Sequence, residues 1–371
     1  MDFREYQYNS FDTFTMHCRR DRVYYAGHDF PAGHFAAEIL NFAGEIKDPI
    51  LERFSALIHL VSQAKDIRDD EVPEFLEKLR PLMHEAVSWI CSCPPFCYQD
   101  NQFRWNEFSV AMDAEQFRKT RDESDEHLPF LFFSFSERVL KILIAIYNFS
   151  LLVRVFERSY LQGLKQRTES TFAKAAHDCF DEDTDFMDLQ EQMPFGEVEE
   201  FFSYPRVILG FSYMEDADNP DKWISVQKVV CKRLIDFYVF DLQNGLQHGH
   251  APSWCRNCHR YFLTTTAHTP KYCDGIAPQD SRMTCRQYGA MMRQKEQNKQ
   301  HPIYRTFNTR TNTIRKHHQR GKISDKLRKD ALYMAEYYRD KALMDNDYAA
   351  NGYQQDMEQE HIYEEARKRL Q

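Results

Sequence analysis

The chain has 371 residues, which is long enough for two or three domains with a substantial core. Apolar residues make up 42% of it and aromatic residues 14%, a composition that excludes an intrinsically disordered protein. Only 12 glycines are present, and neither a P-loop nor a G-x-G-x-x-G motif occurs, which argues against the glycine-dependent nucleotide-binding folds.

Charge is distributed unevenly along the chain. The whole sequence carries a formal net charge of −9, whereas residues 251–331 contain 17 lysines and arginines against 5 aspartates and glutamates. Such a basic stretch in an acidic protein indicates contact with a polyanion, or docking on the acidic remainder of the same chain.

Nothing in the sequence predicts export or membrane insertion. The first residues, Met1–Glu5, lack a basic start followed by an apolar run, so we expect no secretory signal. The most apolar stretch, Ile142–Val153, is bounded by charged residues and is shorter than the roughly twenty residues that span a bilayer. We therefore expect a soluble cytoplasmic protein without membrane contact, whose ten cysteines are reduced thiols or metal ligands.

The first 200 residues predict mostly helices. Residues 1–33 are aromatic and show no clear period, so we expect them to be irregular. From His34 a helical period begins, with one face formed by Phe35, Ile39, Phe42 and Ile46. Further helices are expected near residues 50–64, 72–92 and 106–119, and the apolar segment 136–165 is typical of a helix surrounded by partners.

The region before residue 250 predicts one more helix. Residues 201–214 are compatible with a short strand pair. Asn219 and Pro220 then resemble a helix cap with a first-turn proline, followed by an apolar stripe of Val226, Val230, Leu234 and Phe237. We therefore assign residues 1–247 to one mainly helical domain without an identified role.

The C-terminal third predicts a basic arm and two packed helices. Residues 294–322 are polar on every side, which predicts a loose segment or one stabilised by a partner. Amphipathic helices are expected over residues 324–342 and 362–370. Residues 301–371 are therefore interpreted as a basic arm followed by C-terminal helices.

Four cysteines between these regions have the spacing of a metal site. Cys255 and Cys258 form a two-residue knuckle, and Cys273 and Cys285 follow at longer intervals. Four thiolates close a tetrahedral site, as in structural Zn²⁺ centres. An aromatic strand follows the knuckle, the chain turns back to deliver Cys273, and Cys285 opens a helix, which is a treble-clef-like order. We therefore predict a four-cysteine zinc module over residues 248–300.

Three alternatives remain for the cysteines and histidines. Cys255, Cys258 and His259 have the form of a c-type haem attachment site, which would leave Cys273 and Cys285 unused. A second cluster, Cys91, Cys93 and Cys97, would need a fourth ligand to bind a metal, and a packed helix end is the competing interpretation. Two adjacent histidines at 317 and 318, with Asp325, would suit nuclease chemistry, although such residues commonly face solvent or phosphate.

The cysteine region resembles known sequences. The pattern Cys-x2-Cys, an aromatic strand, Tyr-Cys and Thr-Cys-Arg, within residues 246–321, resembles the C-terminal zinc-binding region of an uncharacterised bacterial and phage-associated family of unknown function. It is more distantly similar to the CGNR zinc fingers of bacterial transcription regulators. The resemblance implies that all four cysteines bind the metal. The chain departs from these patterns in having His259 where glycine is usual and Arg286-Gln287-Tyr288 in place of Gly-Asn-Arg.

The predicted fold is mainly α, with a helical N-terminal domain, a small treble-clef or zinc-ribbon-like module containing a β-hairpin, and C-terminal helices. The first functional hypothesis is a regulatory or mobile-element-associated protein that binds nucleic acid, because the zinc module and the basic segment coincide. The side chains expected to contact phosphate are Arg256, Arg260, Lys271, Arg282, Arg286, Arg293, Arg305, Arg310, Arg315, Lys316 and Arg320. Tyr304, Phe307, His317 and His318 are the candidates for stacking on bases.

The second hypothesis is a structural or interaction protein. In that case zinc only stabilises a small domain, and the basic arm docks on a protein partner, on a second copy or on the acidic part of its own chain. The sequence contains no recognisable enzyme motif, so no catalytic residue is predicted.

Overall fold

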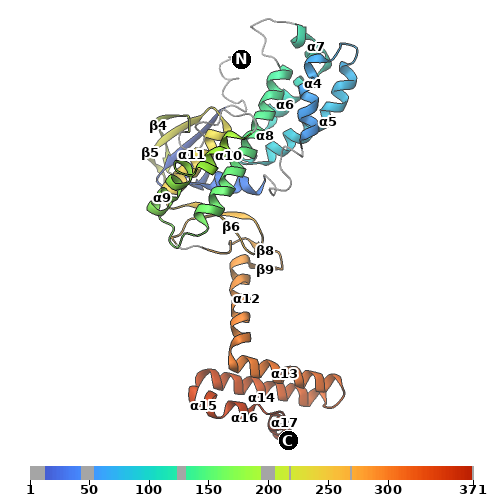
Figure 1. The fold of residues 1–371 in the computed structure, drawn as a ribbon, viewed down its shortest axis with the longest axis vertical. Coiled ribbons are helices and arrows are strands. Elements are labelled where there is room, and N and C mark those ends of the chain that lie inside the picture. The colour runs from blue at the N-terminus through green and yellow to red at the C-terminus, as the bar shows by residue number, and fades with distance from the viewer. Residues whose placement is uncertain are drawn as a thin grey trace. The chain divides into compact units, whose positions relative to one another are not determined.

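The computed structural model describes residues 13–42, 54–122, 131–193, 205–216, 219–267 and 270–369 (Figure 1). The chain divides into two compact units, Met1–Cys273 and Asp274–Gln371. Helix makes up 62% of the structure, and several small antiparallel sheets make up the strands. The expected predominance of helix is therefore confirmed. The three-part division at residues 247 and 300 stays a prediction.

The first unit contains a five-stranded antiparallel sheet, of which the sequence indicated only strand structure within residues 201–214. Its strands run in the order β3-β2-β1-β5-β4. The bounds are β1 (Phe14–Arg19), β2 (Arg22–Tyr25), β3 (His28–Pro31), β4 (Val207–Asp216) and β5 (Asn219–Cys231). The central pairing joins β1 to β5, two strands about 200 residues apart in sequence, with Met16 opposite Val229. The N-terminal unit is therefore an α+β structure, and the expected mainly helical domain needs this correction.

The expectation that residues 1–33 are irregular is wrong for the part that the structure describes. Burial alternates along β1, where Phe14, Met16 and Cys18 face the core. This is the two-residue period of a half-buried strand. Ala26 and Gly27 both adopt positive φ between β2 and β3, which is the backbone of a tight hairpin turn. Strands β1 to β3 are short, and the partner of β1 is the distant strand β5, so the alternation of apolar and polar residues in the sequence was a weak signal.

The helix predicted from Asn219 is wrong over its first half. Residues 219–231 form β5, and helix α11 (Leu234–Gln247) begins after them. An apolar residue at every fourth position fits one face of a helix, but it also fits one face of a strand. The β-branched side chains of Ile224, Val226 and Val230 favour the extended form once β4 supplies a pairing partner. The predicted end of the helix, near residue 245, agrees with α11.

The helices of the first unit pack around one large core. They are α2 (His34–Glu38), η1 (Ile39–Asn41), α4 (Ser55–Gln63), η2 (Ala64–Asp66), α5 (Val72–Ser92), η3 (Phe96–Tyr98), α6 (Gln102–Ala111), α7 (Ala114–Asp122), α8 (Leu131–Phe156), the π-helical turn η4 (Glu157–Leu161), α9 (Glu169–Phe180), α10 (Thr184–Glu191) and α11. The helices expected near 50–64 and 72–92 correspond to α4 and α5. The one expected over 106–119 is divided between α6 and α7, and the helix from His34 ends near residue 41, with Ile46 outside the described residues.

Helix α8 begins before the helix expected over residues 136–165 and ends at Phe156, where the π-helical turn η4 follows. The stretch Phe132–Leu161 has the length and composition of a membrane span, with a mean hydropathy of 1.9. Core helices share these properties, and 67% of the apolar window is buried inside the structure. Buried Phe135, Leu143 and Phe149 belong to the main core cluster. The uncharged stretch Ile142–Val153 is therefore part of a longer apolar helix, and the absence of membrane contact stays a prediction.

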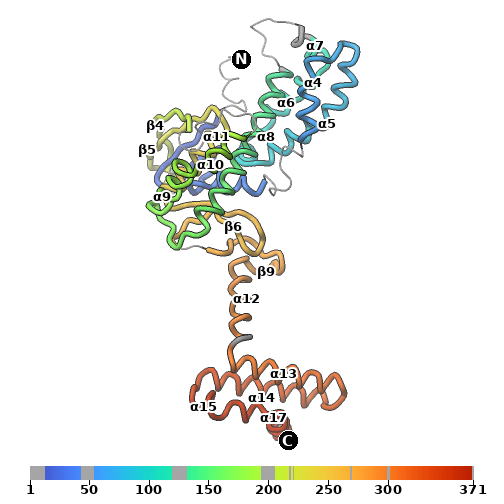
Figure 2. The backbone as a smooth tube through the Cα atoms, in the orientation of Figure 1, coloured from blue at the N-terminus to red at the C-terminus, as the bar shows by residue number. Residues whose placement is uncertain are grey.

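The second unit is helical apart from one hairpin (Figure 2). Its elements are β8 (Ile276–Ala277), β9 (Asp280–Thr284), α12 (Cys285–Gln300), α13 (Pro302–Gln319), α14 (Asp325–Met344), α15 (Asn346–Asn351), α16 (Tyr353–Asp356) and α17 (Gln359–Lys368). A second core cluster lies among α13, α14 and α17, and it includes Ile314, Met334 and Ile362. The helices expected over 324–342 and 362–370 correspond in position to α14 and α17, which pack together, and residue 370 lies outside the described residues.

The basic arm requires a correction. Helix α13 buries Thr311 and Ile314, so its apolar side packs within the second unit. The prediction of a segment that is polar on every side fits residues 294–297 of α12, which are polar and all exposed. Because Ile303, Phe307 and Ile314 are spaced along one face, α13 is an ordinary amphipathic helix.

Candidate metal centre and basic helix

The knuckle that carries the first two cysteines lies between two paired strands. Strand β6 (Ala251–Trp254) runs antiparallel to β7 (Tyr261–Thr264), with Trp254 opposite Tyr261. The turn is closed by a hydrogen bond from the Cys255 N–H to the Arg260 carbonyl, at 2.9 Å. The His259 N–H donates to the Cys255 carbonyl at 3.1 Å. These bonds hold Cys255 and Cys258 on the inside of the same turn.

His259 occupies a left-handed position, with a φ of 55°. Glycine adopts this conformation without steric cost, which explains why knuckles of this kind usually carry it here. Histidine is one of the side chains that tolerate the left-handed region best. Its ring lies 5.9 Å from the Trp254 ring, measured between centroids, so the side chain packs against β6.

The third cysteine is positioned by the loop that returns to the knuckle. The Arg256 N–H donates a hydrogen bond to the Lys271 carbonyl at 3.0 Å, and the Cys273 N–H donates one to Cys255 Sγ at 3.4 Å. The sulfurs of Cys258 and Cys273 are 3.6 Å apart. The expected return of the chain after β7 is therefore present, although residues 271 and 272 form bends and not a strand.

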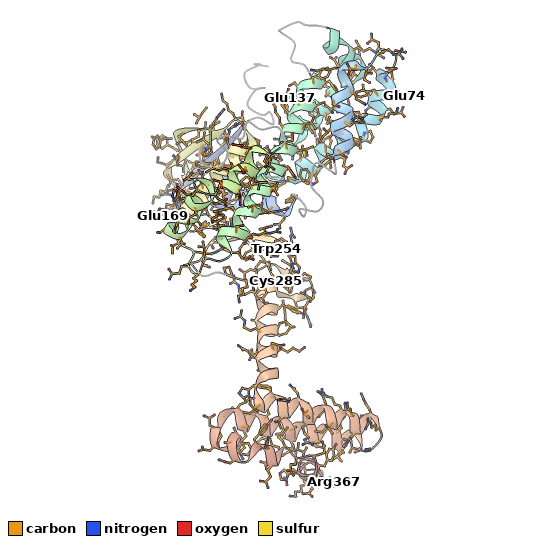
Figure 3. The ribbon with its side chains drawn as sticks, in the orientation of Figure 1. Glu74, Glu137, Glu169, Trp254, Cys285 and Arg367 are labelled. Carbon is orange, nitrogen blue, oxygen red and sulfur yellow. The ribbon has the colours of Figure 1, made fainter. Side chains whose placement is uncertain are left out.

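The fourth cysteine is the first residue of α12 (Figure 3). Thr284 caps this helix by a capping box, in which its hydroxyl accepts from the Gln287 N–H and its own N–H donates to the Gln287 side chain. The Cys285 N–H donates to the Gly275 carbonyl at 2.8 Å. The β8–β9 hairpin fills most of the eleven residues between Cys273 and Cys285. A thiolate at a helix N-terminus is stabilised by the helix dipole.

The four Sγ atoms lie within 4.8 Å of one another. Sulfurs about 2.3 Å from a tetrahedral Zn²⁺ would be about 3.8 Å apart, so the donor atoms and their spacing fit such an ion. The prediction that the four thiols converge is confirmed. Among the described residues this is the one group of three or more His, Cys, Asp or Glu side chains whose ligand atoms could hold a metal ion. Cys91, Cys93 and Cys97 form no such group, so a second metal site is not supported.

The surroundings of Cys255 favour its thiolate form. Burial disfavours the charge, but backbone N–H groups of Cys258, Cys273 and Asn257 outweigh this effect and lower the pKa of Cys255 from 9.0 to about 7. For Cys258, burial and the neighbouring Cys255 sulfur raise the pKa. A bound cation would favour deprotonation of both thiols.

The strands beside the knuckle are anchored in the first unit by polar side chains. Asn41 bonds both backbone groups of Tyr261, accepting from its N–H at 2.7 Å and donating to its carbonyl at 2.9 Å. The fully buried Arg167 donates to the Thr264 hydroxyl at 2.6 Å. No sequence pattern indicates these contacts, because they join residues about 100 and 220 positions apart.

Several of the basic residues predicted to contact phosphate lie next to acidic side chains. Arg282 pairs with Asp280 at 3.2 Å, and Arg286 pairs with Asp274 at 2.8 Å. The charge of Arg260 helps to lower the pKa of Glu38, after the larger effects of its hydrogen bonds with His34 and Tyr98. Arg256, Lys271 and Arg293 are exposed. These carboxylates therefore reduce the positive potential that the basic residues near the cysteines produce.

Helix α13 carries the remaining predicted basic residues, and most of them share its exposed side. Arg305, Arg315 and Lys316 are exposed along the helix, and Arg320 follows at its end. None of these four forms an ion pair with a described residue. Arg310 differs, because it is half-buried and donates to the Gln359 side chain at 3.1 Å.

The aromatic side chains proposed for base stacking are partly occupied. The Arg339 guanidinium lies 4.6 Å from the centre of the Phe307 ring, and His317 Nδ1 is 2.9 Å from the Tyr363 hydroxyl. These two rings therefore take part in the packing of the second unit, and the stacking role expected for them stays a prediction. His318 lies 3.6 Å from Asp325, but the same carboxylate also pairs with Arg328 and Lys329.

The sequence reasoning missed the amide side chains of α13. Asn308, Asn312 and Gln319 are exposed, and their spacing places them on the same side as Arg305, Arg315 and Lys316. The helix contains no aspartate or glutamate. The sequence would have predicted this polar side of α13 if the apolar side of the same helix had been assigned first.

Comparison with protein families gives a match to the C-terminal part of the chain. Residues 203–369 match the model of a family described as a family of unknown function (DUF6076), and this range includes all four cysteines and α13. No curated protein and no solved structure has significant similarity to the chain.

Proposed function

We propose that the four cysteines bind one structural Zn²⁺ and that the chain binds double-stranded DNA through the exposed side of α13. The metal proposal rests on a donor set of four thiols without a place for water or substrate. The order of knuckle, hairpin and helix-borne ligand supports a treble-clef-like centre. Bound zinc would fix Cys285, and with it the start of α12, relative to the knuckle, and it would supply no reactive position.

The single observation that carries DNA binding is the composition of the exposed side of α13. It presents Arg305, Arg315 and Lys316, the three amide side chains and no carboxylate. Lysine and arginine bind phosphates, arginine also recognises guanine, and asparagine and glutamine can form paired hydrogen bonds with adenine. The major groove of B-form DNA admits a helix, whereas the deep and narrow major groove of A-form RNA does not.

The test is a binding titration of the full-length, zinc-loaded protein against duplex DNA, single-stranded DNA and duplex RNA. With about four phosphate contacts, duplex DNA affinity should fall about a hundredfold between about 50 and 200 mM salt. The duplex should compete better than single strands, because the aromatic residues Phe307 and His317 are used in packing. Absence of binding at low salt would refute the DNA proposal and favour a role in protein interaction.

The metal proposal is tested separately by elemental analysis of the purified protein. One zinc per chain is expected, and it should be lost when the ligands are replaced. An iron–sulfur or haem spectrum in the pure protein would contradict a zinc centre.

A further inference from the structure

The outer strand of the five-stranded sheet exposes an unusual number of apolar side chains. Strand β4 lies at the edge of the sheet, and its one strand neighbour in the described part of the chain is β5 (Figure 1). Large exposed fractions are found along both strands, namely Ile208 56%, Leu209 55%, Phe211 83%, Tyr213 71% and Trp223 66%. Isolated exposed apolar residues are common, but a contiguous group on one strand pair marks an interaction surface.

The register places the aromatic residues on one face of the sheet. Phe211 is opposite Gln227, Tyr213 is opposite Ser225, and Trp223 is opposite Glu215. Leu209 is opposite Val229, which is fully buried in the core. The exposed aromatic group therefore continues a face that is covered further along β5 and is uncovered at this end.

The side of β4 that faces away from β5 pairs with no strand of the described residues, and it lacks the features that usually prevent strand association. Exposed edges in soluble proteins commonly carry lysine, proline or a bulge within the strand. Strand β4 has neither lysine nor proline, and its one irregularity of register lies at its end, between Glu215 and Asp216. From Val207 to Met214 the strand has no charged residue.

We propose that β4 pairs antiparallel with β4 of a second copy of this chain, about a two-fold axis through Phe211. This register places the two Phe211 side chains next to each other, and Leu209 opposite Tyr213 on the same face. Pairing about a two-fold axis is closed, so it produces a dimer and not a fibre. The two sheets become one continuous ten-stranded sheet.

Charge at the two ends of the strand favours this arrangement. Arg206 precedes β4, and Glu215 and Asp216 end it. The antiparallel register brings Arg206 of one copy opposite Asp216 of the other, a carboxylate that also lies 3.6 Å from Arg19 of its own chain, whereas a parallel pairing would align like charges. The aromatic face has no basic side chain on β4 or β5, so a nucleic acid is a poor partner for it.

Edge pairing buries the backbone of β4 and the flanks of its side chains, and it leaves the aromatic face of the joined sheet on the surface. The two Phe211 side chains, each 83% exposed in the single chain, contact each other at the two-fold axis, and Leu209 contacts Tyr213 of the other copy. Main-chain hydrogen bonds along the paired strands supply the remaining interaction, as in other cases of strand addition to an exposed sheet edge.

The test is sedimentation velocity of the full-length protein at micromolar concentration. Wild type should be a dimer, and Phe211→Lys and Phe211→Glu should each be monomeric, because like charges meet at the two-fold axis. An equimolar mixture of the two variants should form a heterodimer, since lysine then faces glutamate. Phe211 is so exposed that both variants should retain the wild-type circular dichroism spectrum.

Met344→Lys is the matched control, because this residue is 89% exposed at the end of α14 and lies outside the sheet. It should remain dimeric. A monomeric wild type, a Phe211→Lys variant as dimeric as wild type, or a mixture that stays monomeric would each overturn the proposal.

Discussion

The carboxylate of Asp241 on α11 accepts a hydrogen bond from the backbone N–H of Gly33, 208 residues earlier, at 3.0 Å. Its second oxygen accepts from the Ala36 N–H at 3.0 Å. Gly33 precedes α2, so these bonds satisfy N–H groups that the first turn of a helix leaves without partners. Asp241 is fully buried, and it joins the N-terminal strands and α2 to α11.

This buried carboxylate predicts a pH dependence of stability. Burial raises the pKa of Asp241 from 3.8 to about 6, since desolvation outweighs the backbone N–H donors. The folded protein therefore holds a proton between about pH 4 and pH 6 that the unfolded chain releases, and the associated stability is lost as the pH rises through this window. Each unit of difference between the folded and unfolded pKa corresponds to about 1.4 kcal/mol, so the free energy of unfolding falls by about 3 kcal/mol across this window.

An Asp241→Asn variant lacks this titration. The stability advantage of wild type over the variant should therefore shrink by up to about 3 kcal/mol between pH 4 and pH 7, as measured by urea unfolding at each pH. An advantage that is constant across this range, or that grows with pH, would contradict the assignment.

The contact between Gly245 and Gly33 predicts a steric effect close to the same site. A Cβ atom on Gly245 would lie 2.8 Å from Gly33 Cα, and backbone atoms cannot move aside easily. Gly245→Ala should therefore destabilise the protein by about 1–3 kcal/mol, although alanine normally stabilises a helix. Gly163→Ala is the control, because a Cβ atom on Gly163 would meet no atom within 4 Å. Equal midpoints of urea unfolding for the two variants would refute the steric argument.

Replacing one thiol of the cluster should release the metal. Cys285→Ser removes one of four ligands, so the zinc content measured by elemental analysis should fall well below one per chain, and the melting temperature should fall. Cys97→Ser is the matched control, since Cys97 is exposed and lies outside the cluster. Retention of full zinc content by Cys285→Ser would show that three thiols suffice, which would contradict the four-ligand site.

Two arginines on α13 distinguish DNA contact from structural support. Arg315 is exposed, whereas Arg310 donates to Gln359 of α17. Arg315→Ala should lower the slope of log affinity against log salt by about 1 and leave unfolding unchanged. Arg310→Ala should cost about 1 kcal/mol of stability and leave that slope unchanged. The reverse pattern in DNA titrations and urea unfolding would mean that the basic face of α13 is assigned to the wrong residues.

The sequence predicted the cysteine site well because its information is local. The two-residue spacing of Cys255 and Cys258 defines a knuckle, and Thr284 with Gln287 marks the helix that begins at Cys285. The same applies to α4, α5 and α14, whose apolar residues repeat with the helical period over many turns. These features need no knowledge of distant residues.

Only the tertiary structure decided the remainder. The period of Val226, Val230 and Leu234 fits either helix or strand, and pairing with β4 and β1 selects the strand for the first two. Helix α13 has few apolar residues, and packing against α14 determines which side remains available to a ligand. Asp241 and Gly33 are far apart in sequence, so their contact exists only after the chain has folded. Local spacing thus determined the metal ligands, while long-range pairing and burial decided the sheet and the exposed faces, because these depend on partners that no local pattern identifies.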